Sequence, residues 1–322
     1  MNVKEMKKQV PIFNADIGHI FDSKSVELKK KNNRFTMSYL FFLFLGALFA
    51  DLSIKNNETM WLAIAFTAIA LIFYGVKTYK NFIDQWTYTR VAAETIKSEW
   101  FKFTVGGGDY PVTRNDEQEK YYIKSFINKI NETFEDYKEN IRKSRGNPLT
   151  DFEISKEDVE SNYRNESLNQ RIEFYKKERI QNQQKWYESK TSIMKAKEKR
   201  YQIFFPVVIS VGLILGILRL FNIELTNNFV FLNSDWFSIM IALAFALDAV
   251  NSLFQHERLK LAYEKSANDL SESFKKINDP SNDVSSDEEV FNEFVEDVEN
   301  LISSEHKSWS LTTSTRSLLS NS

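Results

Sequence analysis

The amino-acid sequence predicts an all-α integral membrane protein, with four transmembrane helices in two hairpins and a long cytoplasmic helical stalk. Two observations predict this fold class. The 322-residue chain contains four long blocks that are almost free of charge, although 27% of all its residues are charged. Helical periodicity then continues through the charged segments beside these blocks. The mean hydropathy of −0.39 is therefore an average over two different kinds of sequence.

Each apolar block has about the length of a membrane-spanning helix. The four blocks lie between Arg34 and Lys55, between Glu58 and Lys77, between Arg200 and Arg219, and from Trp236 to Phe254. A helix needs about 20 mainly apolar residues to cross a hydrocarbon core of about 30 Å. The first block contains one charged residue, Asp51, the fourth contains Asp248, and the others contain none. Four helices of a soluble bundle would instead need polar faces, which these blocks lack.

Basic residues predict how the hairpins are oriented. The loop inside each hairpin is short and contributes a single basic residue, Lys55 or Arg219. The opposite ends of the blocks are flanked by many basic residues: Lys29, Lys30, Lys31, Arg34, Lys77, Lys80, Lys195, Lys197, Lys199, Arg200, Arg258 and Lys260. By the positive-inside rule, both termini and the centre of the chain lie in the cytoplasm.

Glycine, proline and shifts in composition divide the chain into five segments. Residues 1–34 form a cytoplasmic N-terminal segment, and residues 35–105 form the first transmembrane hairpin with a stalk helix that GGGDYP (106–111) ends. Residues 106–164 form a cytoplasmic linker with one amphipathic helix. Residues 165–278 form the second stalk helix and transmembrane hairpin. Residues 279–322 form an acidic helix, expected to dock on the basic surface of a partner, and a disordered tail rich in Ser and Thr.

The composition argues against most kinds of catalytic site. The chain has no cysteine, and its three histidines, His19, His256 and His306, lie far apart in the sequence. Thiolate chemistry is therefore excluded, and no histidine has the spacing of a metal ligand. The glycines at 106–108 are not followed by GK[ST], so they are not a phosphate-binding loop. A net charge of −2 provides no basic field for nucleic acid. We expect neither an enzyme nor a cofactor.

The fourth block carries the clearest candidate for a functional polar group. Asp248 lies within it, and Asp248, Asn251 and Gln255 recur at spacings of three and four, which places them on one helical stripe. A carboxylate in a span is a functional candidate because it is costly to place there. The stripe either lines a pore or lets Asp248 hydrogen-bond a neighbouring span. Gly212 and Gly216 form a GxxxG pattern that either closes the second hairpin, which we favour, or joins two subunits.

Charged and aromatic residues on the two stalk helices predict contacts between them. The first stalk helix presents Trp86, Arg90, Glu94 and Lys97 on one stripe. The second stripe contains Leu168, Ile172, Tyr175, Arg179, Gln183, Trp186 and Lys190. An anionic nucleotide bound between the cations and the indoles is one interpretation. We favour the simpler one, in which Arg90 and Glu94 form an i,i+4 pair on a surface between helices.

Two motifs in these helices resemble the SLATT superfamily, the SMODS- and SLOG-associating two-transmembrane effector domains. WTYTRVAAETIKS (86–98) resembles a pattern that follows the hairpin in one subfamily. RIQNQQKWYESK (179–190) resembles a pattern that precedes the hairpin in another. Their order indicates two SLATT units in tandem, over roughly residues 30–275. The resemblance implies a bacterial effector that opens or disrupts the membrane when a partner detects phage or a cyclic nucleotide.

The expected function follows from the spans and this resemblance together. We expect a pore-forming or membrane-perturbing effector of a bacterial nucleotide-signalling or anti-phage defence system, in the inner membrane. Its expected partners are the lipid bilayer, further copies of itself, and a soluble sensor or nucleotide-generating protein. The alternative is a non-conducting membrane scaffold whose cytoplasmic stalk recruits a soluble partner enzyme. The polar stripe through Asp248 distinguishes the pore from the scaffold, because only a pore requires this stripe to face water.

Overall fold

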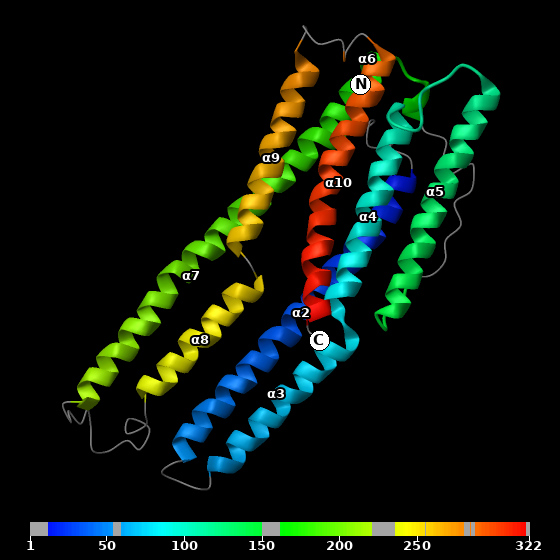
Figure 1. Cartoon of the computed structure of the whole chain (residues 1–322). Helices are drawn as coiled ribbons and strands as arrows, with labels where there is room; N and C mark the ends of the chain where they lie inside the picture. Colours follow the sequence, from blue (N-terminus) through cyan, green and yellow to red (C-terminus); the bar gives the residue numbers. More distant parts are fainter. Residues whose placement is uncertain are drawn as a thin grey trace. The chain divides into compact units, whose positions relative to one another are not determined.

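The computed structural model describes residues 12–53, 59–149, 162–220, 236–254, 256–279, 284 and 287–319, and contains no strand among them (Figure 1). The all-α fold class is therefore confirmed. The α-helices are α2 (Ile12–Ser53), α3 (Met60–Lys80), α4 (Phe82–Val105), α5 (Asp116–Lys143), α6 (Leu168–Tyr175), α7 (Asn182–Leu220), α8 (Trp236–Phe254), α9 (His256–Asn278) and α10 (Glu288–Leu319). A π-helical turn, Lys176–Gln181, joins α6 to α7.

The chain divides into two compact units. The first, here called the stalk unit, contains Met1–Lys30, Lys80–Glu188 and Ala262–Ser322. The second, the hairpin unit, contains Lys31–Tyr79 and Ser189–Leu261. The helices α2 and α7 contribute to both units without interruption. The hairpin unit holds the apolar blocks, and the stalk unit holds most of the charged helices.

Three helical segments are long and apolar enough to cross a membrane, so the chain is a membrane protein. They lie within Ile20–Leu52, Met60–Val105 and Leu168–Leu218. The fourth predicted span coincides with α8, but its apolar stretch, Ile239–Asp248, is shorter among the residues that the structure describes. The count of four spans therefore remains a prediction.

Aromatic rings hold the first hairpin together. Phe42 of α2 stacks on Phe73 of α3 with ring centroids 5.6 Å apart, and Phe49 contacts Phe66 at 5.3 Å. Between these pairs, Gly46 lies against Thr67, where a Cβ on the glycine would come within 2.5 Å of the hydroxyl. The absence of a side chain at Gly46 is therefore what allows α2 and α3 to approach closely.

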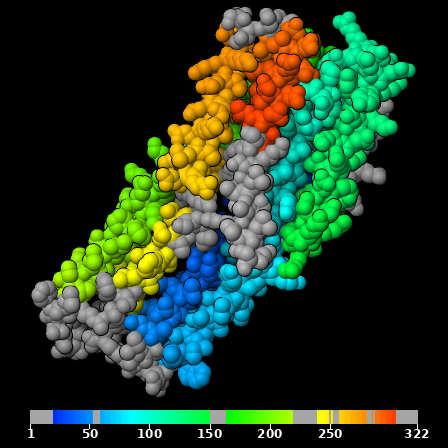
Figure 2. All heavy atoms as spheres, in the orientation of Figure 1, coloured from blue at the N-terminus to red at the C-terminus, as the bar shows by residue number. Residues whose placement is uncertain are grey.

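The helix α4 forms the centre of the stalk unit. It is buried on most of its sides, and α5 and α10 pack along it (Figure 1). In the space-filling view the atoms of α5 lie directly beside those of α4 (Figure 2). The amphipathic face predicted for residues 106–164 is buried at Ile130, Phe134, Tyr137 and Ile141. As predicted, α4 ends at the glycines, where Gly106 adopts φ = +80° and caps the helix.

Both ends of the chain contain more helix than the sequence analysis expects. Residues 12–34 are helical and continuous with the first span, and Phe21 is fully buried against Tyr137 of α5 at 5.0 Å. At the other end α10 continues to Leu319, into the stretch for which the sequence suggests disorder. Residues 288–319 contain no glycine or proline to end a helix there.

A π-helical turn changes the face that the second stalk helix buries. Tyr175, Ile180, Tyr187 and Met194 are buried, and their spacings are five, seven and seven residues. The spacing of five spans the π-turn, where the i→i+5 pattern accommodates one more residue than an α-helix does. The buried stripe therefore passes through Tyr187, whereas Trp186 is only half-buried.

Candidate functional sites in the stalk and the second hairpin

A buried ion pair lies at the centre of the stalk unit. The guanidinium of Arg179, in the π-turn, donates to both carboxylate oxygens of Glu299 on α10, at 2.8 and 2.6 Å. The Tyr175 hydroxyl donates to the same carboxylate at 3.0 Å. Burial raises the pKa of Tyr175 well above its ordinary value, so the hydroxyl stays protonated and remains a donor. Burial alone lowers the pKa of Arg179, but the ionised Glu299 more than offsets it and the pKa is raised.

A second group of charges joins α2 to α4. Arg90 binds Glu94 at 2.7 Å and Asp22 at 2.9 Å, while Lys97 binds Asp22 at 2.6 Å. The i,i+4 pair expected of Arg90 and Glu94 is therefore present. Asp22, which no sequence pattern singled out, lies between the two cations and connects them across a helix–helix contact.

Each tryptophan of the two predicted stalk stripes, Trp86 and Trp186, contacts a cation. The ammonium of Lys29 lies 4.6 Å from the ring centroid of Trp86, and the Arg90 guanidinium lies 5.3 Å from that of Trp186. The structure thus brings Arg90 of the first stripe onto Trp186 of the second. Trp186 also meets Tyr263 of α9 edge-on at 5.6 Å. Arg90, Lys97 and Arg179 each pair with a carboxylate, from Asp22, Glu94 or Glu299. These three cations are therefore already bound by anions of the chain, which disfavours their use for an anionic nucleotide.

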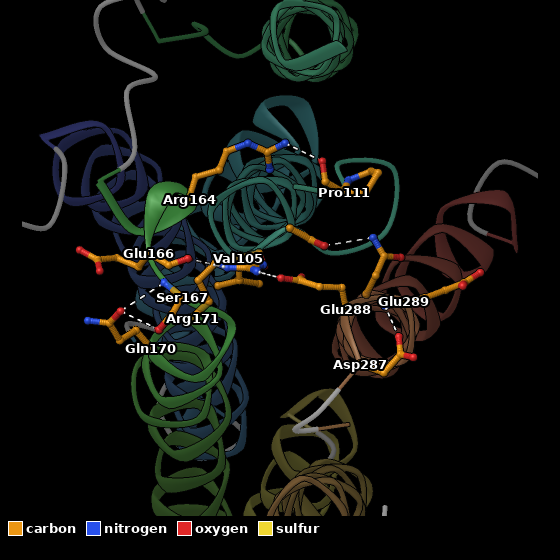
Figure 3. A network of polar contacts seen from close by, with 12 residues as sticks. Val105, Pro111, Arg164, Glu166, Ser167, Gln170, Arg171, Asp287, Glu288 and Glu289 are labelled. Carbon is orange, nitrogen blue, oxygen red and sulfur yellow. Dashed lines mark hydrogen bonds and ion pairs between the residues drawn. The ribbon is translucent and has the colours of Figure 1, made fainter. Parts of the chain in front are cut away.

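The glycine loop after α4 is held by side chains that donate to its carbonyl groups. Arg171 donates to the Val105 carbonyl at 2.7 Å and pairs with Glu288 at the start of α10 (Figure 3). Asn292 of α10 donates to the carbonyls of Gly106 and Gly108 at 3.0 and 2.9 Å. This loop therefore binds α10, and its carbonyl groups face amide and guanidinium donors.

A third buried arginine holds the segment that follows the glycines. Arg164 donates to the carbonyls of Phe103 and Tyr110 at 2.7 and 2.8 Å and pairs with Glu119 of α5. It also donates to the carbonyl of Pro111 at 2.9 Å (Figure 3). Its side chain is 4% exposed. Sequence reasoning missed Arg164 and Arg171, because an arginine that binds distant carbonyl groups leaves no periodic signal.

In the second hairpin, Asp248 lies at one end of an apolar groove. The Tyr201 hydroxyl donates to its carboxylate at 2.9 Å, yet Asp248 remains exposed. The groove, of about 300 Å³, is bounded by α7 and α8 and lined by Phe205, Ile209, Gly212, Leu213, Met240, Ile241, Ala244, Phe245 and Asp248. Asn251 is half-exposed, and Gln255 lies outside the described residues.

The glycine pair in α7 occupies two different environments. Gly212 is buried against Met240 of α8, where a Cβ on the glycine would lie 3.0 Å from that of the methionine. Gly216 is half-exposed. Gly212 thus allows close contact within the second hairpin. Among the described residues no group of His, Cys, Asp and Glu is placed to hold a metal ion.

Two family models match the chain in tandem. Residues 17–172 match SMODS and SLOG-associating 2TM effector domain 3, and residues 175–309 match SMODS and SLOG-associating 2TM effector domain 1. No match was found among curated proteins or among solved structures. The first matched range contains α4 and α5, and the second contains most of α10. The contact of α10 with α4 therefore joins the two matched ranges in one stalk core.

Proposed function

Because the chain belongs to the SLATT superfamily, as two two-transmembrane effector domains in tandem, we propose that it is a pore-forming or membrane-perturbing effector of a bacterial nucleotide-signalling or anti-phage defence system. The observation that carries this proposal is the shared stalk. Residues of both domains build its core, and α2 and α7 run from it into the two hairpins without a break. A rearrangement in the stalk would thus act on both hairpins.

The proposal includes a location and partners. The basic flanks support an inner-membrane protein whose termini and stalk are cytoplasmic. A soluble sensor or nucleotide-generating protein would then meet the stalk, and the effector itself would not be an enzyme. Four spans in one subunit can hardly enclose a conducting path, so the conducting form would be a homo-oligomer. Native mass spectrometry of the detergent-solubilised protein tests this, and a strictly monomeric species that still conducts would contradict it.

Release of a trapped dye from liposomes tests the membrane activity itself. Purified protein is added to lipid vesicles at increasing ratios, with and without cyclic nucleotides, and we expect release. In Gly212→Leu the side chain would force α8 away from α7, so release should fall. Gly75→Leu is the matched control, because nothing lies within 4 Å of a Cβ at Gly75. Full retention of dye by wild-type protein under all conditions would contradict the pore-forming role and favour the scaffold.

A further inference from the structure

The apolar groove of the second hairpin combines two features that a membrane helix rarely exposes together. Its walls are side chains such as Phe205, Leu213 and Phe245, which match hydrocarbon. At its end lies the exposed carboxylate of Asp248, whose one described hydrogen bond comes from Tyr201. An ionised carboxylate beside lipid is costly unless a cation or water reaches it. The groove therefore provides an apolar surface next to a group that requires a cation.

The sequence around Tyr201 places this carboxylate near the headgroups. Tyr201 directly follows the basic run of Lys195, Lys197, Lys199 and Arg200, at the start of the apolar part of α7. Its hydrogen bond holds Asp248 at the same level as the end of this run. Lys197, four residues before Tyr201, lies on the same helical face and is exposed. Asp248 thus lies at the end of the groove, and Lys197 lies one helical turn beyond Tyr201 toward the basic run.

We propose that this groove binds a phospholipid with a primary-amine headgroup from the cytoplasmic leaflet. One acyl chain lies along the apolar walls, the ammonium group meets Asp248, and the phosphate meets Lys197. A lipid with only negative charge in its headgroup would place an anion against the carboxylate, which costs free energy. An amine lipid also supplies the cation and the hydrocarbon chain in one molecule, at the depth where both are required.

The inference rests on the proposed membrane location but does not require that the protein conducts. Asp248 could line a water-filled path only after the ammonium had left. A bound amine lipid would therefore favour the non-conducting state. Lipid binding and conduction are separate measurements, so the failure of one is distinguishable from the failure of the other.

Native mass spectrometry with defined lipids tests the proposal. The detergent-purified full-length protein is titrated with phosphatidylethanolamine and with phosphatidylglycerol that carry the same acyl chains. We expect wild-type protein to bind phosphatidylethanolamine about tenfold more tightly. Asp248→Asn should abolish this preference, and Ala244→Phe should weaken binding of both lipids by filling the groove. Asp51→Asn is the matched control, since it removes the other carboxylate within a predicted span and should preserve the preference.

Two results would overturn the proposal. One is equal binding of the two lipids by wild-type protein, and the other is a preference that survives in Asp248→Asn. If Asp248→Asn instead dissociates an oligomer without changing lipid binding, the groove is an interface between copies and the lipid site is wrong. Circular dichroism checks that each variant is folded.

Discussion

At the scale of single residues, three buried arginines define the stalk unit. Arg164, Arg171 and Arg179 are 4%, 1% and 3% exposed. Each guanidinium is held by carbonyl groups, by a carboxylate or by both. A buried charge is tolerated only when it is paired and hydrogen-bonded, so each of these contacts has to form together with the packing around it. These residues therefore specify which helices pair, in addition to any stability that they provide.

The pair of Arg179 and Glu299 gives a direct test of this argument. Glu299→Leu leaves the guanidinium buried without its anion and should lower the free energy of unfolding by about 3–5 kcal/mol. Replacing both partners, as Arg179→Met with Glu299→Leu, should restore much of that loss. Denaturant titration followed by tryptophan fluorescence measures both changes. A double variant no more stable than the single one would show that the pair itself, and not the unpaired charge, carries the stability.

A glycine controls how closely α10 approaches the end of α4. A Cβ added at Gly107 would overlap the side chain of Val295. Gly107→Ala should therefore lower the free energy of unfolding by about 1–3 kcal/mol, the usual cost of overpacking. Adding Val295→Ala should recover part of the loss. Gly75→Ala, in a helix with open space around it, should leave the thermal midpoint unchanged or higher. Equal effects of the two glycine variants would contradict this account.

Asp248 is the residue through which the pore proposal is most directly tested. Several copies around an axis would form an acidic ring that favours cations. Asp248→Asn should then leave the fold intact and shift the reversal potential of planar bilayers under a salt gradient. If Asp248 only binds a neighbouring group, asparagine can replace much of its hydrogen bonding. Identical selectivity of two conducting proteins would remove Asp248 from the pore.

At the scale of elements, the sequence predicts helix type and helix ends well wherever a local signal exists. The apolar blocks indicate the hairpins, and GGGDYP correctly ends α4. The N-terminal helix was missed, because residues 12–30 carry no apolar block and only tertiary contacts such as Phe21 with Tyr137 reveal their role. The π-turn was also missed, since a single stripe through Gln183 and Trp186 assumes 3.6 residues per turn throughout.

The π-turn makes a prediction about deletions. Lys177 lies within the turn and is exposed, so deleting it should convert the turn into α-helix while both flanking segments keep their faces. Deleting the exposed Lys185, in the regular part of α7, should rotate the side chains of all later α7 residues by about 100° around the helix axis. We expect the thermal midpoint of the first variant to be far closer to wild type than that of the second. If both deletions lower the thermal midpoint equally, the π-turn does not accommodate the removal of one residue.

At the scale of the whole molecule, the two domains share one folding core. The acidic helix was expected to dock on the basic surface of a partner, whereas Glu288 and Glu299 of α10 bind Arg171 and Arg179 of the same chain. The sequence could not say that this surface lies in the same chain, because no local pattern relates residues more than 100 positions apart. The contacts predicted between the stalk helices were also incomplete. The sequence placed Arg90 near Trp186 but did not indicate that Arg90 binds Asp22 of α2.

The proposed topology is open to a test that uses the absence of cysteine. Single cysteines can be introduced into an otherwise cysteine-free chain and treated in whole cells with a thiol reagent that does not cross the membrane. Position 120, on the exposed side of α5, should be protected because the proposed topology places the stalk in the cytoplasm. Position 310 should also be protected, and position 57, in the first hairpin loop, should be labelled; the structure does not describe the side chains at these two positions. Labelling after permeabilisation shows that each cysteine is reactive. Labelling at 120 and 310 with protection at 57 would invert the topology, and the stalk could then no longer meet a cytoplasmic partner.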